Sequence, residues 1–345
     1  MFTEPDLFDL EMELIFEKNW IYACHESEIA NNHDFMTMRA GRQPMIITRD
    51  GEGKLNALIN ACQHRGTTLT RVGKGNQSTF TCPFHAWCYK SDGRLVKVKA
   101  PGEYSEGFDK AIRGLKKARI ESYKGFVYVS LDVNGTDSLE DYPGDAKVFF
   151  DMMVAQSPTG ELEVLPGKSA YTYDGNWKLQ NENGLDGYHV STVHYNYVAT
   201  FFLDQISSQL RIIRPIAWNK TEINSFCLGV KGESDADREN RIRQFEDFFN
   251  VSGLGTPDDL VEFREAQRGF QVRLERWSDI SRGERKWVKG ATPNSETIGN
   301  SPVMTGTEFT HEGLYVNQLG NWQRFLLEVL ARKAEQENSL KLQEV

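Results

Sequence analysis

Two short segments of the chain each combine one cysteine with one histidine. Cys62-Gln63-His64 is followed, after seventeen intervening residues, by Cys82-Pro83-Phe84-His85. Two thiolates and two imidazoles suit either a tetrahedral zinc ion or an iron–sulfur cluster with mixed ligands. A zinc finger keeps its cysteines together and its histidines together, whereas each segment here supplies one of each. We therefore expect facing loops that place both thiolates on one metal and both imidazoles on another.

A two-iron two-sulfur cluster with these ligands is a Rieske centre. Neutral imidazoles in place of two thiolates remove negative charge and raise the reduction potential, so such a centre accepts and passes single electrons. Gly66 relaxes the backbone after the first loop, and the position of Trp87 suggests that it shields the cluster from water. The alternative is that Cys62 and Cys82 are small buried side chains, which is the better explanation for one such pair but not for two.

A second candidate metal site lies in Asn181–Tyr197, where Asp186, His189 and His194 fall within nine residues. Two histidines and a carboxylate on one metal form the facial triad of non-haem Fe(II) oxygenases. Asp186 and His189 are helical neighbours, so the carboxylate is placed to orient the imidazole. His189 and His194 are roughly 140° apart on a helix of ~3.6 residues per turn, so joint ligation predicts a break between Val190 and Val193. The alternative is a polar helix face.

The third ligand must come from another part of the chain, and carboxylates are too common for the sequence alone to choose one. Thr256-Pro257-Asp258-Asp259 offers two of them. The same four residues also form an ordinary helix start, with Thr256 as N-cap, proline in the first turn and acids that suit the helix dipole. Both interpretations of Asp258 and Asp259 remain open from the residues alone.

The sequence predicts two domains of fold class α+β. Residues 19–133 contain strand-like runs separated by Gly, Asn and Asp, which indicates a small antiparallel β domain. The polar segment Asp132–Asp141 marks the boundary, and residues 134–345 form a mixed second domain. The expected elements are strands in Gln43–Thr48, Leu55–Ala61, Lys124–Leu131 and Glu161–Thr172, a hairpin of Leu210–Trp218 with Glu222–Val230, and helices near Tyr142–Met153, Ala236–Val251 and Asn321–Arg332.

Composition excludes several classes of protein. The 345 residues include 49 acids and 40 bases, a net charge of −9, which argues against a nucleic-acid-binding surface. No apolar run approaches the ~20 residues of a membrane span. The first twenty residues carry six acids and one base, which does not fit a secretory signal, so we expect a cytoplasmic protein. Five cysteines over this length do not suggest a disulfide framework.

A one-electron relay followed by an open iron site points to oxygen activation, and the chain resembles a family with that chemistry. The runs NWIYACHES, NACQHRG, TCPFHAW and WKLQNENGLDGYHVSTVHYNY are similar to the large (α) subunits of Rieske non-haem iron ring-hydroxylating dioxygenases. Within that family they are most similar to the branch acting on benzoate, toluate and anthranilate. The resemblance implies a Rieske β domain and a helix-grip-like catalytic domain with an antiparallel sheet.

The resemblance also implies cofactors and residue roles. Cys62, His64, Cys82 and His85 would bind one 2Fe-2S cluster. His189, His194 and Asp259 would bind one mononuclear Fe(2+), with Asp258 as the alternative third ligand. Asp186 would connect His189 to a Rieske histidine of a neighbouring subunit, and Asn183 would line the iron pocket.

The implied reaction adds both atoms of O2 to an aromatic carboxylate. NADH supplies the electrons through a separate flavin and iron–sulfur reductase, and a small (β) subunit completes an assembly built on a trimer of αβ pairs. The expected substrate is anthranilate, converted to catechol with loss of CO2 and ammonia. Benzoate, toluate or a halobenzoate is the first alternative. An electron-transfer protein with a non-functional second site is an alternative of another class.

The chain departs from the family pattern at its N-terminus, which starts later than expected, and at an internal segment. Family members contain several dozen residues between segments like those ending at Thr200 and beginning at Phe201, whereas here the two segments are joined directly. The missing stretch would line the substrate pocket.

Overall fold

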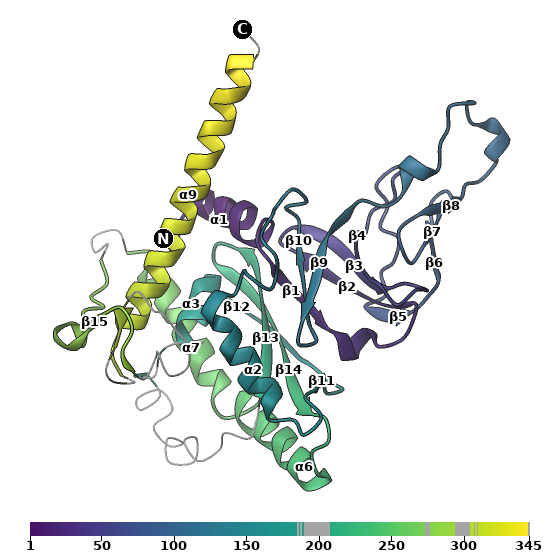
Figure 1. The fold of residues 1–345 in the computed structure, drawn as a ribbon. Helices are drawn as coiled ribbons and strands as arrows, with labels where there is room; N and C mark the ends of the chain where they lie inside the picture. The colour runs from purple at the N-terminus through teal and green to yellow at the C-terminus, as the bar shows by residue number, and fades with distance from the viewer. Residues whose placement is uncertain are drawn as a thin grey trace. The chain divides into compact units, whose positions relative to one another are not determined.

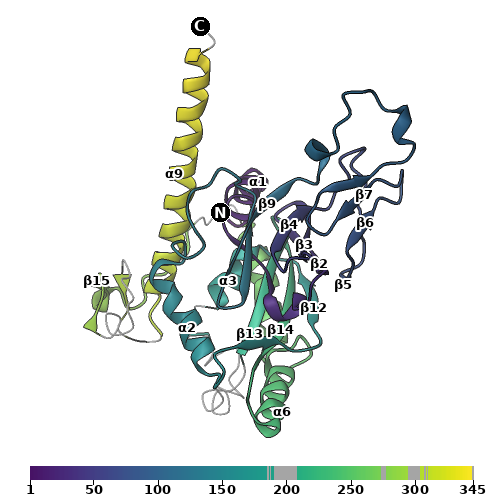
Figure 2. The same cartoon turned by 45° about the vertical axis from the view of Figure 1, so that its right-hand side comes forward.

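The computed structural model describes residues 1–184, 186, 188–189, 208–272, 277–293, 304–306, 308 and 310–343. The chain separates into two compact units. The β unit comprises residues 15–144 and 154–164, and the mixed unit comprises residues 1–14, 145–153 and 165–345. Figures 1 and 2 show strands and loops in the first, and helices beside a sheet in the second.

The β unit contains two antiparallel sheets. The larger sheet has the order β1-β10-β9-β4-β3-β2-β5, with β1 (Ile21–His25), β2 (Asp34–Ala40), β3 (Gln43–Arg49), β4 (Leu55–Ile59), β5 (Lys74–Asn76), β9 (Lys117–Tyr123) and β10 (Phe126–Ser130). The smaller sheet has the order β6-β7-β8, with β6 (Thr79–Thr81), β7 (Cys88–Lys90) and β8 (Leu95–Lys97). The unit also includes three 3₁₀ turns and a short strand, namely η2 (Glu26–Ile29), η3 (Pro101–Glu103), η4 (Ala111–Arg113) and β11 (Leu162–Val164).

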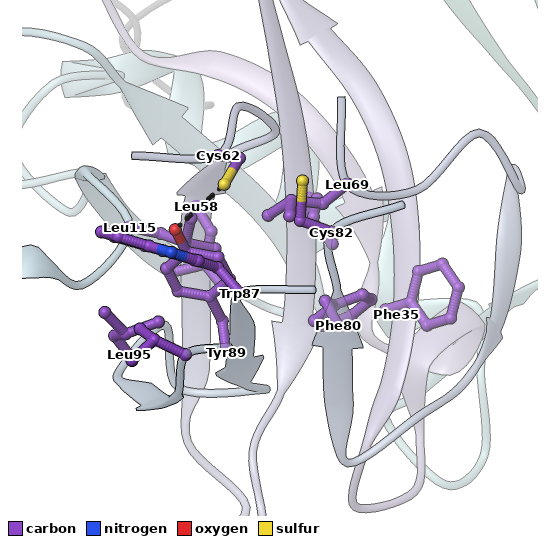
Figure 3. Close-up of a cluster of buried hydrophobic side chains, with 12 residues drawn as sticks. Phe35, Leu58, Cys62, Leu69, Phe80, Cys82, Trp87, Tyr89, Leu95 and Leu115 are labelled. Atoms are coloured by element: carbon purple, nitrogen blue, oxygen red, sulfur yellow. Dashed lines mark hydrogen bonds between the residues drawn. The ribbon is translucent and has the colours of Figure 1, made fainter. Parts of the chain in front are cut away.

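Apolar side chains from the two sheets form the core that supports the first candidate site. Phe35, Leu58 and Phe80 are buried there together with Tyr89 and Trp87 (Figure 3). Both Cys62 and Cys82 lie at the edge of this cluster and are buried. A separate core, which includes Ile47 and Val127, fills another part of the same unit.

The mixed unit is built around the antiparallel sheet β12-β14-β13. Its strands are β12 (Ser169–Tyr173), β13 (Ser208–Ala217) and β14 (Lys220–Val230), and its helices are α1 (Pro5–Glu11), α3 (Trp177–Asn183), α6 (Asp235–Gln244), α7 (Thr256–Gly269), α9 (Gly313–Gln343) and most of α2 (Lys147–Ala155). Shorter pieces are η1 (Met12–Phe16), η5 (Gly144–Ala146), η6 (Phe245–Phe249), η7 (Glu284–Lys286), β15 (Val288–Lys289) and β16 (Met304–Thr305). Leu179 of α3, Phe263 of α7 and Ile223 of β14 share one core, which packs both helices on the sheet.

Most of the expected elements are present. Strands β3, β4 and β10 confirm three of the predicted runs, and β13 and β14 pair as the predicted hairpin around Asn219. The run Glu161–Thr172 was predicted as one strand but is divided, because Pro166 and Gly167 interrupt it. Helix α9 is longer than expected. Within the described part of the chain, no helix has the length and apolar character needed to cross a membrane.

Candidate metal centres

The two Cys-His segments form loops with nearly the same backbone. Cys62 follows β4 and Cys82 follows β6. In each loop the cysteine carbonyl accepts a hydrogen bond from the residue four positions on, Gly66 at 2.8 Å and Ala86 at 3.0 Å. Both of these residues have positive φ, 74° and 60°. This left-handed turn is easy for glycine and costly for alanine, which shows how tightly the second loop is constrained.

The thiols lie at the same end of the buried cluster in Figure 3. The Tyr89 hydroxyl lies 3.3 Å from Cys62 Sγ and also accepts a hydrogen bond from the backbone amide of Gln63 at 3.0 Å. Because that amide already donates to the hydroxyl oxygen, the Tyr89 proton is free to point at the sulfur. Burial raises the pKa of Tyr89, so the hydroxyl stays a donor.

The two imidazoles of the pattern lie side by side. The rings of His64 and His85 have centroids 4.6 Å apart and are tilted by 79°. The Trp87 ring stacks on His64, with centroids 5.1 Å apart and the planes nearly parallel, and Trp87 donates its Nε1 hydrogen to the Tyr104 hydroxyl at 3.0 Å. Trp87 therefore covers one side of the His64 ring, and its expected role in shielding a cluster from water stays a prediction.

These four side chains fit a mixed-ligand iron–sulfur cluster. His85 Nδ1 is buried and has no hydrogen-bond partner among the described residues, which is the condition expected of an atom that ligates a metal. Partial burial and the nearby His64 ring lower the pKa of His85, so the ring is neutral, as ligation requires. The thiols of Cys62 and Cys82 are both free of disulfides.

The second centre begins at the end of α3. Asn176 caps this helix by accepting a hydrogen bond from the Lys178 amide, and Asn183 is its last residue. Beyond it, Asp186 accepts hydrogen bonds from the backbone amides of Tyr188 and His189, at 2.8 and 3.3 Å. The side chain of Asp186 thus fixes the turn that presents His189.

His189 lies between two carboxylates. Its Nδ1 is 3.3 Å from Asp186 Oδ2, and its Nε2 is 3.5 Å from Asp259 Oδ1. The Asn183 amide nitrogen lies 3.1 Å from His189 Nε2 and donates to Asp259 Oδ1 at 3.2 Å. One ring nitrogen is therefore held by an orienting carboxylate, and the other faces the carboxylate of Asp259 and the amide of Asn183.

The charges at this centre are strongly coupled. Burial opposes ionisation of Asp186, but hydrogen bonds with His189 and Tyr315 outweigh it and lower its pKa to about 2. Burial also opposes the charged form of His189, yet its two carboxylate partners raise its pKa to about 9. Without a metal the ring therefore carries a proton, which a metal ion would have to replace.

The structure distinguishes the two neighbouring acids of α7. Asp259 is buried and its Oδ1 lies 3.5 Å from His189 Nε2, whereas Asp258 is only half-buried. The helix start differs from the expected one. Gly255 takes the N-cap position in place of Thr256, whose hydroxyl donates to the Phe249 carbonyl at 2.9 Å, so the prediction of a threonine cap was wrong. Proline in the first turn was correctly expected.

Several expectations cannot be compared with the structure. His194, the break between Val190 and Val193, and the junction of Thr200 with Phe201 lie outside the described residues. In the ranges that are described, no three His, Cys, Asp or Glu side chains are grouped closely enough to hold a single metal ion. At the second centre the described part supplies His189 and Asp259, with Asp186 on the far side of the ring.

Two contacts at these centres were not foreseen from the sequence. Tyr89 reaches Cys62 from a strand that the second loop leads into, and Tyr315 reaches Asp186 from the first turn of α9. Neither residue belongs to a spaced motif. Neither tyrosine has a local sequence signal, because Cys62 lies 27 residues from Tyr89 and Asp186 lies 129 residues from Tyr315.

Comparisons with known proteins identify relatives over nearly the whole chain. Residues 19–123 match the Rieske [2Fe-2S] domain family. The chain is 61% identical over 423 residues to the anthranilate 1,2-dioxygenase large subunit of Acinetobacter baylyi, covering 97% of this chain and 90% of that protein. It is 39% identical over 421 residues to the toluate 1,2-dioxygenase subunit alpha of Pseudomonas putida, covering 97% and 92%.

A solved structure shows the same fold. Naphthalene 1,2-dioxygenase from Rhodococcus sp. superposes with a TM-score of 0.85 at 24% identity, covering 94% of this chain and 92% of that one. This confirms the α+β architecture of a Rieske domain with a catalytic domain. The alignment with the Acinetobacter protein spans 423 positions and the chain has 345 residues, so at least 78 of those positions have no residue here.

Proposed function

The chain belongs to the Rieske non-haem iron ring-hydroxylating dioxygenases, and on that premise we propose that it is the large subunit of an enzyme that dihydroxylates anthranilate. The choice of anthranilate as substrate rests on sequence identity. The chain is 61% identical to the Acinetobacter protein, compared with 39% to the toluate relative and 38% to the 2-halobenzoate 1,2-dioxygenase large subunit of Burkholderia cepacia. All three relatives act on an aromatic carboxylate by name, so the class of substrate is common to them and the amino group is the specific part of the proposal.

The overall reaction consumes anthranilate, O2, NADH and two protons. Hydroxyl groups are added at the two ring carbons that bear the amino and carboxylate groups. The resulting diol loses CO2 and ammonia to give catechol, and NADH is oxidised to NAD+. The electrons arrive from a separate flavin and iron–sulfur reductase. A small β subunit completes the oxygenase as αβ pairs built on a trimer, and we expect the enzyme in the cytoplasm, where NADH is supplied.

Two groups of side chains would hold the metals. Cys62, His64, Cys82 and His85 would bind the 2Fe-2S cluster, which is supported by the matched loops, the adjacent imidazoles and the buried Nδ1 of His85, which has no hydrogen-bond partner in the described part of the chain. The mononuclear iron would be bound by His189, His194 and Asp259. When bound, the cluster supplies single electrons and the mononuclear Fe(II) supplies the site at which O2 is reduced.

The remaining residues of the second centre orient the ligands. Asp186 holds His189 through Nδ1 and keeps a negative charge at working pH, because its pKa is about 2. The same carboxylate would connect His189 to a Rieske histidine of the neighbouring subunit. Asn183 spans His189 and Asp259 and so fixes the distance between these two ligands.

A substrate comparison tests the proposal. Purified chain with the small subunit and reductase should consume NADH and O2 faster with anthranilate than with benzoate, toluate or 2-halobenzoate at equal concentration. A preference for benzoate or toluate would assign the chain to the other members of the branch. An electron-transfer protein with a non-functional second site would show no substrate-dependent O2 consumption and would contain two irons per chain where three are expected.

A further inference from the structure

A buried ion pair lies in the mixed unit outside both metal centres. Lys178 Nζ donates to Glu11 Oε1 at 2.5 Å, and the two side chains are only 3% and 1% exposed. Glu11 is the last residue of α1, and Lys178 lies in the first turn of α3. Two opposite charges taken out of water cost free energy unless every remaining lone pair and proton is also satisfied.

Aromatic side chains complete the surroundings of this pair. Glu11 accepts two further hydrogen bonds, from Trp177 Nε1 at 2.8 Å and from Trp322 Nε1 at 3.1 Å. The Lys178 ammonium lies 5.2 to 5.6 Å from the ring centroids of Trp177, Trp322 and Phe2, within range of cation–π attraction. The carboxylate is thus bound by three donors on α3 and α9.

A second set of buried polar contacts lies at the same end of α3. The backbone amide of Asn176 donates a hydrogen bond to Gln267 Oε1 of α7 at 2.8 Å. Gln267 Nε2 and Asn176 Nδ2 both donate to the Phe2 carbonyl, at 3.2 and 3.3 Å. These bonds join the start of α3 to the end of α7 and to the first residues of the chain.

The same three helices meet again at the candidate iron site. Asn183 of α3 donates to Asp259 of α7, and Tyr315 of α9 hydrogen-bonds Asp186 just beyond α3. Asn176 and Asn183 are seven residues apart, as are Tyr315 and Trp322, which corresponds to about 10 Å of helix in each case. Asp259 and Gln267 are about 12 Å apart along α7. Helix α3 is therefore linked to α7 near both of its ends, and to the first third of α9 through Glu11 at its start and Asp186 just beyond its end.

We propose that Glu11, Lys178 and Trp322 act as positioning residues. Their buried hydrogen bonds set the register of α3 relative to α9 and thereby place the residues of the candidate iron site. The inference rests on the proposed function only in taking His189 and Asp259 as iron ligands. A well-packed apolar pair of similar volume can replace a buried ion pair without loss of stability, so stability alone does not explain these charges. Directional hydrogen bonds from two helices to one carboxylate restrict sliding and rotation, which apolar contacts do not.

The test uses the complete oxygenase and measures iron binding in the absence of substrate. In the double variant Glu11→Leu/Lys178→Met, apolar groups of similar size fill the space but cannot fix the register. After removal of the mononuclear iron, its Kd for added Fe(II) is measured by competition with a ferrous chelator. We expect the affinity to fall by about tenfold or more, the range typical of residues that orient ligands. The visible absorbance of the Rieske cluster should not change.

A matched control comes from another buried ion pair of the same unit. Glu233 and Arg241 are joined at 2.9 Å with side chains 5% and 7% exposed, and Glu233 also pairs with Arg238 at 2.9 Å. Arg241 lies on α6 and Glu233 just before it, so neither belongs to α3, α7 or α9. The double variant Glu233→Leu/Arg241→Met removes a comparable pair. We expect its unfolding temperature to fall while its Kd for Fe(II) changes less than about twofold.

The iron-binding measurements decide whether the ion pair positions the candidate iron site. Weaker iron binding in Glu11→Leu/Lys178→Met but not in the control supports the positioning role. Unchanged binding in the first variant, or equal weakening in both, overturns it.

If the first variant fails to fold, Trp322→Phe keeps the ring over Lys178 and removes only the hydrogen bond to Glu11. It should weaken iron binding by about threefold to tenfold, and wild-type affinity would overturn the proposal. Failure of the wild type to turn over anthranilate would reject the proposed function without affecting this comparison.

Discussion

Asn183 at the end of α3 donates a hydrogen bond of 3.2 Å to Asp259 in the first turn of α7. This bond joins two segments that are 76 residues apart in the sequence. It brings a carboxylate to 3.5 Å from His189, on the ring nitrogen that Asp186 does not hold. The contact favours Asp259 over the less buried Asp258 as the candidate ligand.

Asn substitutions at the two acids of α7 test that selection. Asp259→Asn should lose most of its mononuclear iron, because a neutral amide replaces a charged ligand, and its Fe(II) affinity should fall by more than the roughly 10- to 100-fold typical of residues that only orient ligands. Asp258→Asn should retain the wild-type iron content. Metal analysis after purification and reconstitution distinguishes them, with the Rieske absorbance as an internal measure of intact protein. Normal iron in Asp259→Asn together with loss in Asp258→Asn would shift the ligand by one residue.

The variant Asp186→Asn tests the connecting role of that carboxylate. It keeps the size of the side chain and its contacts with the backbone amides of Tyr188 and His189, so both metals and the fold should be retained. Product formation should fall by about 100-fold, at the upper end of the effect of residues that orient ligands. Rapid mixing of reduced enzyme with O2 and substrate should show a Rieske cluster that stays reduced. Normal product formation would reject the role.

Tyr89→Phe should lower the reduction potential of the Rieske centre. The Tyr89 hydroxyl lies 3.3 Å from Cys62 Sγ, and a hydrogen bond to a ligand sulfur stabilises the more negative, reduced state. Loss of about 1 kcal/mol of such stabilisation corresponds to about 40 mV for a one-electron couple. Redox titration by visible absorbance measures the shift. Tyr104→Phe is the control, because Tyr104 contacts Trp87 but not the thiols. Equal potentials in wild type and Tyr89→Phe would contradict the prediction.

Protein without mononuclear iron should lose stability as the pH rises. Asp186 and Asp259 raise the pKa of His189 from 6.5 to about 9. The folded protein therefore keeps a proton on His189 at pH values where the unfolded chain has already released it. The resulting stabilisation is complete below pH 6.5 and disappears as the pH rises through about 9. The difference in unfolding temperature between this protein and its His189→Gln variant should therefore narrow between pH 6.5 and 9. A difference independent of pH would show that His189 is not charged.

Local patterns in the sequence predicted much of the fold and of the first centre. Cys62 and Cys82 follow strands, and the short spacing to His64 and His85 is enough to indicate paired loops. Such motifs can be read because the ligands of each loop are close in sequence. Strand alternation identified the β13–β14 hairpin for the same reason.

Contacts between distant segments could not be predicted in this way. Lys178 lies at the start of a polar helix, where the sequence indicates an exposed side chain. In the structure it forms a buried ion pair with Glu11, 167 residues earlier in the chain. The position of Asp259 beside His189 depends on the rotation of α7, which is set by packing of Phe263 against the sheet. A sequence shows the period of a helix but not the neighbour that each face will meet.

Catechol production from anthranilate tests the central claim most directly. The chain, reconstituted with its small subunit and reductase, is supplied with NADH and ¹⁸O2, and catechol, ammonia and oxidised NADH are quantified. The account predicts one catechol and one ammonia per NADH, with both catechol oxygens labelled, because both hydroxyl groups derive from the same O2. Absence of catechol, or catechol carrying a single label, would contradict it.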